Sequence, residues 1–338
     1  MSTRDAATAP EQALQEPTSG NGMATARPFK NILVFTDGAP RDRVALVRAA
    51  ALAERHGARL TALSVLESLP CELQRLTIPI HPADLWELAA KERRQKLDRL
   101  AARVWKGNAG FTTKVVAGSP FMEVIREVLR KQHDLVMMVA EGQGGLKDAL
   151  FGSTSTHLMR KCPCPVWAMK SGRPKTYARV LAAVNPVPSD EDHNSLNVKI
   201  MEVATSLSRL EGSQLHVVHA LTPVARWLSV AGSRITKSEM ARIDRANEEE
   251  HLNWFDELLA RVRLDDLKVQ RHLLKGDASR LIPRLALRKR IDVIVMGTVC
   301  RAGVPGLFIG NTAERVLRHV TCSVLTVKPD GFVSPVTA

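Results

Sequence analysis

Aromatic residues are scarce in this sequence: Phe, Trp and Tyr together make up 4% of it, and there is a single tyrosine. The hydrophobic share is nevertheless 45%, so a core must be built mainly from Val, Leu, Ile and Ala. That mixture suits buried parallel strands covered by helices rich in Ala and Leu. No apolar run is longer than a strand, so we expect no segment that crosses a membrane.

Cysteine is also infrequent, and its spacing favours neither a disulfide framework nor a zinc site. The five cysteines are Cys71, Cys162, Cys164, Cys300 and Cys322. Cys162 and Cys164 flank Pro163 too closely to join separate elements, and we expect them to pack as small apolar side chains rather than act in redox chemistry. Residues 1–29 lack the continuous apolar segment of a secretory signal, so we expect reduced thiols and a cytoplasmic protein.

The charge balance is basic, with a formal net charge of +13 at pH 7. Lys and Arg are spread along the chain among acids, which favours a generally basic surface over a nucleic-acid-binding patch. The basic helix expected near 84–105 contains Lys91, Arg93 and Arg94, and we interpret it as a solvated outer face because no recognised nucleic-acid module accompanies it. A phosphate-rich small ligand fits this charge as well as nucleic acid does.

Strand-length apolar runs alternate with helical segments from Asn31 onward. The patterns predict strands at 32–36, 59–66, 112–116, 135–139 and 165–169, and helices at 42–56, 84–105, 120–131 and 153–161. The strands are almost continuously apolar, as expected when both faces of a parallel sheet are covered. The order of elements therefore predicts an α/β fold with a doubly wound parallel sheet.

The same pattern occurs twice. A shift of about 158 residues places Asp134 on Asp292, Gly152 on Gly310 and Cys164 on Cys322. We expect two tandem doubly wound domains, each with a parallel five-stranded sheet, packed as a pseudo-dimer. The predicted limits are a disordered tail at 1–29, domain 1 at 30–170, a linker at 171–177, domain 2 at 178–330 and a tail at 331–338.

A glycine-containing loop follows the fourth strand of each copy and ends where a helix begins. Free backbone N–H groups at a helix start, with hydroxyls beside them, form a ready anion site, and ligands of open parallel sheets bind beyond the carboxyl ends of the strands. The candidate ligand-binding residues are Asp37, Gly142, Gly152, Ser153 and Thr154 in the first copy, and Gly297, Gly310, Asn311 and Thr312 in the second.

These motifs carry a family resemblance that covers about residues 30–330. The strings HDLVMMVA, LMRKCPCPVW, AAVNPVPSDEDHNSLN and GNTAERVLRHVTCSVLTVKPDG resemble the tandem universal stress proteins of the universal stress protein E type. The resemblance implies a cytoplasmic stress-response protein with two domains about a pseudo-twofold axis. It also implies ATP as the candidate ligand. The family's ATP-binding motif is a Gly, two further residues, a second Gly, nine further residues, and then a Gly followed by Ser or Thr.

Neither copy keeps that ATP motif complete. The first has Val139 in place of the opening Gly, and the second has Cys300 in place of the middle Gly and Asn311 in place of Ser or Thr. The family's acid on the adenine side matches Asp37 in the first copy but only Asn185 in the second. The first copy is therefore the better nucleotide candidate.

Two other functions stay open. A nucleotide-free scaffold could take an apolar ligand or a protein partner, as the apolar residues Val224, Trp227, Leu228, Val230 and Ile235 suggest. Weak ATPase activity ranks third, because Ser153 and Ser155 have no triad partners. We expect a binding protein rather than an enzyme, without membrane or nucleic-acid partners. Self-association is left open.

We expect no metal. His216 and His219 lie three residues apart on one predicted strand, so their side chains point to opposite faces and cannot share an ion.

Overall fold

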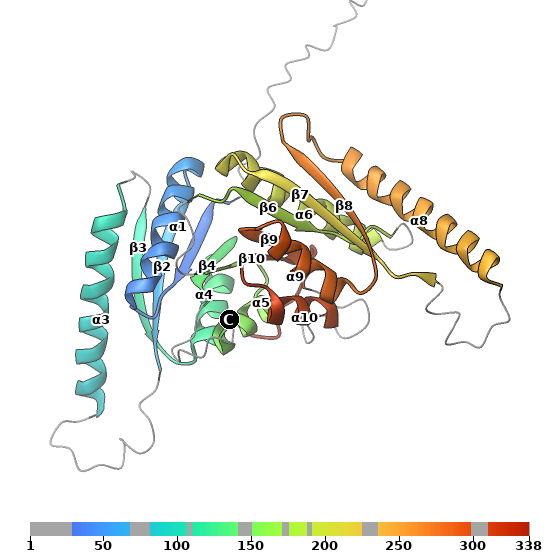
Figure 1. Cartoon of the computed structure of the whole chain (residues 1–338). Coiled ribbons are helices and arrows are strands. Elements are labelled where there is room, and N and C mark those ends of the chain that lie inside the picture. The colour runs from blue at the N-terminus through green and yellow to red at the C-terminus, as the bar shows by residue number, and fades with distance from the viewer. Residues whose placement is uncertain are drawn as a thin grey trace, which may run out of the picture.

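The computed structural model describes residues 29–67, 82–106, 110–140, 151–170, 176–187, 191–224, 236–298 and 310–337 (Figure 1). The predicted N-terminal tail up to residue 28 and most of the predicted linker, 171–175, lie outside these ranges, as do Gly142 and Cys300.

The first half of the chain forms the elements that hydrophobic periodicity predicts. They are β1 (Asn31–Phe35), a 3-10 helix (Pro40–Asp42), α1 (Arg43–His56), β2 (Arg59–Leu66), α3 (Pro82–Val104), β3 (Phe111–Ala117), α4 (Pro120–Lys131), β4 (Leu135–Val139), α5 (Ser153–Lys161) and β5 (Val166–Met169). Local signals fix their ends. Gly57 closes α1 in the left-handed conformation, with φ 62°, and Pro120 opens α4.

The second half repeats this order. Its elements are β6 (Arg179–Ala183), α6 (Glu191–Glu211), β7 (Gln214–Leu221), α8 (Lys237–Ala260), β8 (Val269–Lys275), α9 (Ala278–Arg288), β9 (Val293–Gly297), α10 (Asn311–His319) and β10 (Ser323–Val327). A capping box between Thr236 and Glu239 starts α8.

All ten strands form one sheet, in the order β3-β2-β1-β4-β5-β10-β9-β6-β7-β8. Each half contributes five parallel strands in an equivalent order, which confirms the predicted fold class. The two halves meet where β5 pairs antiparallel with β10, with Trp167 opposite Leu325. The two predicted sheets are therefore one continuous sheet, joined through hydrogen bonds at its centre.

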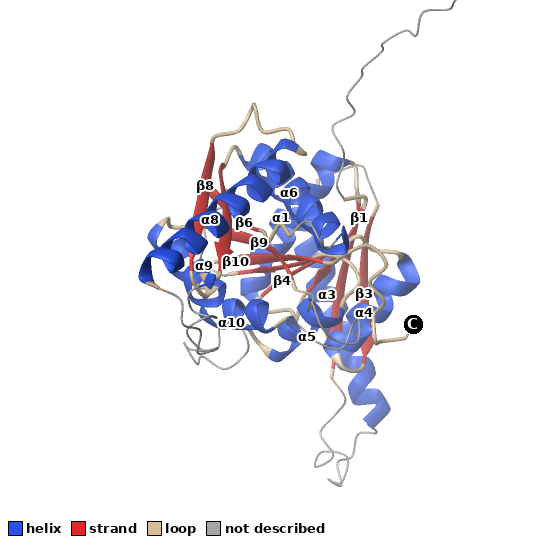
Figure 2. Ribbon diagram, turned by 90° about the vertical axis from the view of Figure 1, so that its right-hand side faces the viewer, coloured by secondary structure: helices blue, strands red, loops and turns tan. Residues whose placement is uncertain are grey.

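Helices cover both faces of the sheet (Figure 2). Strand side chains alternate between two cores. One core packs residues of α1 and α6, with contributions from α3 and α8, against strand residues such as Trp167 and Leu325. The other packs α4, α5, α9 and α10 against residues such as Ala168 and Val324. Each core thus runs across both halves of the molecule.

Buried polar contacts tie the halves together on the α1 and α6 side of the central strand pair. Arg48 of α1 forms an ion pair with Glu211 of α6, 2.5 Å between Nη1 and Oε1, and both side chains are about nine-tenths buried. The Arg48 guanidinium lies 3.9 Å from the centre of the Tyr177 ring. The Tyr177 hydroxyl donates to Ser323 Oγ at 3.0 Å. A buried cation with these partners is well satisfied.

A second polar contact lies on the α5 side. The buried Lys328 ammonium, beyond β10, donates to the carbonyl oxygens of Met159 and Arg160 at 2.9 and 3.0 Å and to Thr298 Oγ1 at 2.6 Å. The two carbonyls belong to the last turns of α5, where a cation also complements the helix dipole. Burial lowers the pKa of Lys328 to about 8.

Packing extends slightly beyond the predicted domain limits. Phe29, assigned to the N-terminal tail, is buried and stacks on His56. Tyr177, assigned to the linker, is buried as well. Val336, in the predicted C-terminal tail, packs against the core formed by α4, α5, α9 and α10.

Candidate functional site

The strand register brings the predicted ligand residues of the first half to one edge of the sheet. Val34 of β1 lies opposite Met137 of β4, so Asp37 lies near the level of Ala140, just beyond the two strands. The Ala140 carbonyl accepts a hydrogen bond from the N–H of Gly152, 3.2 Å from N to O. Asp37 and the start of α5 therefore share the carboxyl edge of the sheet, where ligands of doubly wound folds bind.

Asp37 already has protein partners at this edge. Its carboxylate forms an ion pair with Arg41 and accepts the backbone N–H of Ala39 at 2.8 Å. Its side chain is about a quarter exposed. A ligand that used Asp37 would therefore have to compete with Arg41 for this carboxylate.

Lys91 and Arg94 of α3 are exposed, as expected for a solvated face, but Arg93 turns inward and reaches this edge. Its guanidinium donates to the backbone carbonyl of Asp37 and to Ser64 Oγ. The Arg93 side chain also lies beside Gly38, where an added Cβ atom would be 3.2 Å from Arg93 Cδ. This contact and the φ of +83° both favour glycine at position 38. Sequence patterns do not predict this role, because basic residues surround Arg93 on the same helix and only the tertiary fold turns this one inward.

Asp42 stabilises the backbone at this edge through hydrogen bonds. Its buried carboxylate accepts the Thr36 hydroxyl at 2.7 Å and the Asp37 N–H at 2.9 Å. Burial raises the pKa of Asp42 to about 6, while the Thr36 hydrogen bond opposes that rise. The second half has Asn197 at the equivalent position, and its amide binds both the N–H and the C=O of Asn185, at 2.9 and 3.0 Å.

The start of α5 suits an anion. Gly152 is its N-cap and offers no side-chain cap, and the first turn carries no acid. Ser153 is exposed and Thr154 is partly exposed, whereas Ser155 is buried and donates to the Gly152 carbonyl at 3.0 Å. Within the described residues no side chain caps the N–H groups of this first turn, so they can receive an anionic ligand, with the hydroxyls of Ser153 and Thr154 beside them.

The start of α10 is built alike but is less suited to an anion. Gly310 is the N-cap without a side-chain cap, and its N–H binds the Thr298 carbonyl at 3.0 Å. Asn311 and Thr312 are both exposed. However, Glu314 lies in the first turn, where its negative charge opposes another anion.

Gly297 has a packing reason to be glycine. A Cβ atom added there would lie 2.8 Å from Cδ2 of Leu196 in α6 and 3.6 Å from Cδ1 of Ile200. In the first half the equivalent strand position is Val139, and the helix position equivalent to Ile200 is Ala45. The two halves thus exchange a large and a small residue across the same helix–strand contact.

The two candidate histidines point to opposite faces, as predicted. His216 Nδ1 lies 3.0 Å from Nε2 of His272, and His219 Nε2 lies 2.7 Å from Nδ1 of His251. Burial lowers the pKa of His216 to about 4, and the nearby His272 adds to the effect. Within the described ranges no group of three or more His, Cys, Asp or Glu side chains is placed to hold a metal ion.

The cysteines Cys162, Cys164 and Cys322 are buried and form no disulfide with one another. The sulfurs of Cys162 and Cys164 lie 3.6 Å apart, and the pKa of Cys164 is raised well above its usual value by its hydrogen bond with Cys162 and by burial. A raised pKa disfavours the reactive thiolate, in line with the predicted packing role. No helix in the described part of the chain is long and apolar enough to cross a membrane.

Two equivalent halves, each with an uncapped helix start at the carboxyl edge of its strands, define a tandem doubly wound α/β protein. The family model described as the universal stress protein family matches residues 28–170 and 176–328. The chain therefore belongs to the universal stress protein family, and it is a stress-response protein with two such domains.

Individual relatives agree over nearly the whole length. The chain is 30% identical over 312 residues to universal stress protein E of Escherichia coli (strain K12), which covers 91% of this chain and 96% of that protein. It is 29% identical over 313 residues to universal stress protein E of Photorhabdus laumondii, with coverage of 92% and 98%. A solved structure of a functionally unknown protein from Pseudomonas aeruginosa PAO1 matches with a TM-score of 0.61 and 27% identity over 90% of this chain and 95% of that one.

Proposed function

We propose that this protein is a regulatory binding protein of the cytoplasm that responds to stress by binding an adenine nucleotide in its first half, with ATP as the leading candidate. Asp37 would face the adenine side, and Gly152, Ser153 and Thr154 would meet the phosphates. Gly142 of the family pattern lies between β4 and α5, outside the described residues.

The observation that carries this proposal is the first turn of α5. It combines uncapped N–H groups, exposed hydroxyl side chains and the absence of an acid, at the same sheet edge as Asp37. Arg93 and Arg41 add positive charge there, which suits a polyanionic ligand. In the second half, Glu314 and the Leu196 side chain against Gly297 favour a site that has lost the nucleotide.

Calorimetric titration with ATP tests the proposal. The protein should saturate with one nucleotide per chain. Gly152→Val should weaken binding at least about tenfold, because its φ of −65° and ψ of 170° suit Val while the added methyl groups block the phosphates. Asp37→Ala should also weaken binding.

The second half supplies matched controls. Gly310→Val and Asn185→Ala change equivalent positions and should leave the affinity for ATP unchanged. Absence of saturable binding at millimolar ATP would contradict the proposal, and so would equal losses from the variants of both halves.

The second candidate function is a nucleotide-free scaffold that binds an apolar ligand or a protein, and the incomplete ATP motifs of both halves favour it. Of the apolar residues that suggested it, Trp227, Leu228, Val230 and Ile235 lie outside the described residues. Mass spectrometry of gently purified protein separates the two: a copurifying nucleotide supports the first candidate, and a copurifying apolar molecule supports the second.

A further inference from the structure

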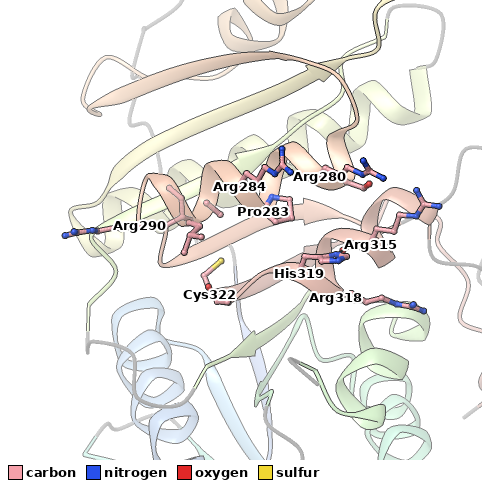
Figure 3. Close-up of a pocket in the computed structure, with 13 residues that line it drawn as sticks. Arg280, Pro283, Arg284, Arg290, Arg315, Arg318, His319 and Cys322 are labelled. Atoms are coloured by element: carbon pink, nitrogen blue, oxygen red, sulfur yellow. The ribbon is translucent and has the colours of Figure 1, made fainter. Parts of the chain in front are cut away.

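A groove of about 940 Å³ lies between α9 and α10, away from the nucleotide edge of the first half (Figure 3). Its floor is apolar and includes Pro283, Ala286 and Ile291. Leu287, in the last turn of α9, also lines it and is 72% exposed. The groove therefore offers apolar surface that nothing in the described parts of the chain covers.

Its walls are strongly basic. Arg280, Arg284 and Arg290 line it from α9 and the turn after α9, and Arg315, Arg318 and His319 line it from α10. Among the described residues, no acid lines the groove. Two acids contact its arginines: Glu314 pairs with Arg318 at 2.6 Å, and the Asp277 carboxylate lies 3.8 Å from Arg280. Positive charge thus lies on both walls of an apolar floor.

The first half closes the same groove. At the positions equivalent to Ser279 and Arg315, it has Phe121 and His157, whose rings stack with centroids 4.4 Å apart between α4 and α5. Lys161 lies over the Phe121 ring, 4.9 Å from its centre. In the second half, Ser279 is turned to Asp277, with 2.7 Å between the two side-chain oxygens, and leaves this space open. The two halves therefore differ in how this space between neighbouring helices is filled.

We propose that this groove, the α9–α10 groove, binds an acidic amphipathic helix of a partner protein. Helix α9 has 11 residues and is therefore about 16 Å long, which is enough to contact roughly three turns of such a helix. Apolar residues at every third and fourth position would cover Leu287 and the partly exposed Pro283, and flanking carboxylates would meet the arginines of both walls.

The form of the groove favours this partner over other anions. The arginines are spread along two helices rather than aimed at one point, so a single phosphate would leave most of them without a partner. In the part of the chain that the structure describes, no Phe, Tyr or Trp lines the groove, and bases of single-stranded nucleic acid stack mainly on such side chains. A helix with a leucine stripe between rows of glutamate matches both the floor and the walls.

The test uses the full chain and a fluorescent 14-residue peptide with Leu at helical i, i+3, i+4 and i+7 spacing and Glu on both flanks. Fluorescence anisotropy should show saturable binding that weakens as salt is added. A scrambled peptide of the same composition should bind at least about tenfold more weakly, because only the helical spacing aligns its leucines.

Ser279→Phe with Arg315→His installs the stacked pair of the first half and should weaken binding at least about tenfold. Leu287→Asp should weaken binding to a similar extent. Because it changes an exposed side chain, it still tests the proposal if the paired substitution disturbs folding. The control, Arg130→Glu with Lys131→Glu, lowers the charge at exposed positions on α4 of the first half and should leave binding unchanged.

Three outcomes would overturn the proposal: no saturable binding of the peptide, equal binding of the scrambled peptide, or a DNA oligonucleotide that displaces the peptide and binds the Leu287→Asp variant as well as the unmodified protein. The groove shares no residue with the nucleotide site of the first half, so ATP titration of the same variants separates failure of this proposal from failure of the proposed function.

Discussion

Asp42 is a buried acid whose position is occupied by the neutral Asn197 in the second half. Its pKa rises from 3.8 to about 6 on folding, so the folded protein binds more protons than the unfolded chain between these values. The free energy of unfolding should therefore fall as the pH rises from about 4 to about 6. Asp42→Asn should remove this dependence and stabilise the protein at pH 7 by on the order of 1–2 kcal/mol.

Urea denaturation at pH 5 and pH 7 measures this effect. Asn197→Asp is the reverse change in the second half, and it should destabilise the protein more at pH 7 than at pH 5. An Asp42→Asn variant with the pH dependence of the unmodified protein would contradict the assignment of that dependence to Asp42.

At this scale the sequence predicts which residues reach the ligand edge of the first half, because strand ends and helix starts leave local signals. It places Asp37, Gly152, Ser153 and Thr154 together, and the register agrees for the described residues. It does not predict that Arg41 and Arg93 engage the Asp37 side chain and backbone. The contact of Arg93 depends on how α3 packs, and helical periodicity cannot distinguish it from neighbouring surface arginines.

At the scale of elements, the contact between β9 and α6 depends on Gly297. Gly297→Val should destabilise the protein by about 1–3 kcal/mol, because its side chain would enter the space of Leu196. Leu196→Ala creates that space, so the double variant should lose less stability than the sum of the two single variants. Thermal unfolding of the three variants measures this coupling, and strict additivity would show that Leu196 is not the obstacle.

The elements themselves were predicted well because each combines hydrophobic periodicity with a clear end signal. The predicted strands at 59–66 and 135–139 and the helices at 120–131 and 153–161 have the observed bounds. The reason for glycine at position 297 could not be predicted in the same way. It depends on Leu196, which is about a hundred residues away in the sequence and reaches β9 only in the folded sheet.

At the scale of the whole molecule, the buried pair of Arg48 and Glu211 links α1 to α6. Arg48→Met should destabilise the protein by roughly 3–5 kcal/mol, because it leaves the Glu211 carboxylate buried without its cation. Adding Glu211→Gln removes that charge and should recover part of the loss. Guanidinium denaturation measures both variants, and a double variant no more stable than Arg48→Met would contradict this explanation.

The tandem arrangement was predictable from the internal repeat, but the single sheet was not. Strand patterns show that β5 and β10 are buried, yet they do not say which strand lies beside each of them. Their antiparallel pairing is a contact between two halves about 158 residues apart in the chain. Only the fold reveals that the core on each face crosses this junction.

The pairing of β5 with β10 also has a consequence for how the two halves behave in a cell. Since both strands belong to one polypeptide, their association does not depend on how much protein is made, and dilution cannot separate them. Each molecule always carries one copy of each half. Differences between equivalent positions, such as Phe121 in the first half and Ser279 in the second, can then accumulate in one half alone. A single gene product can thus present two different surfaces in a fixed one-to-one ratio.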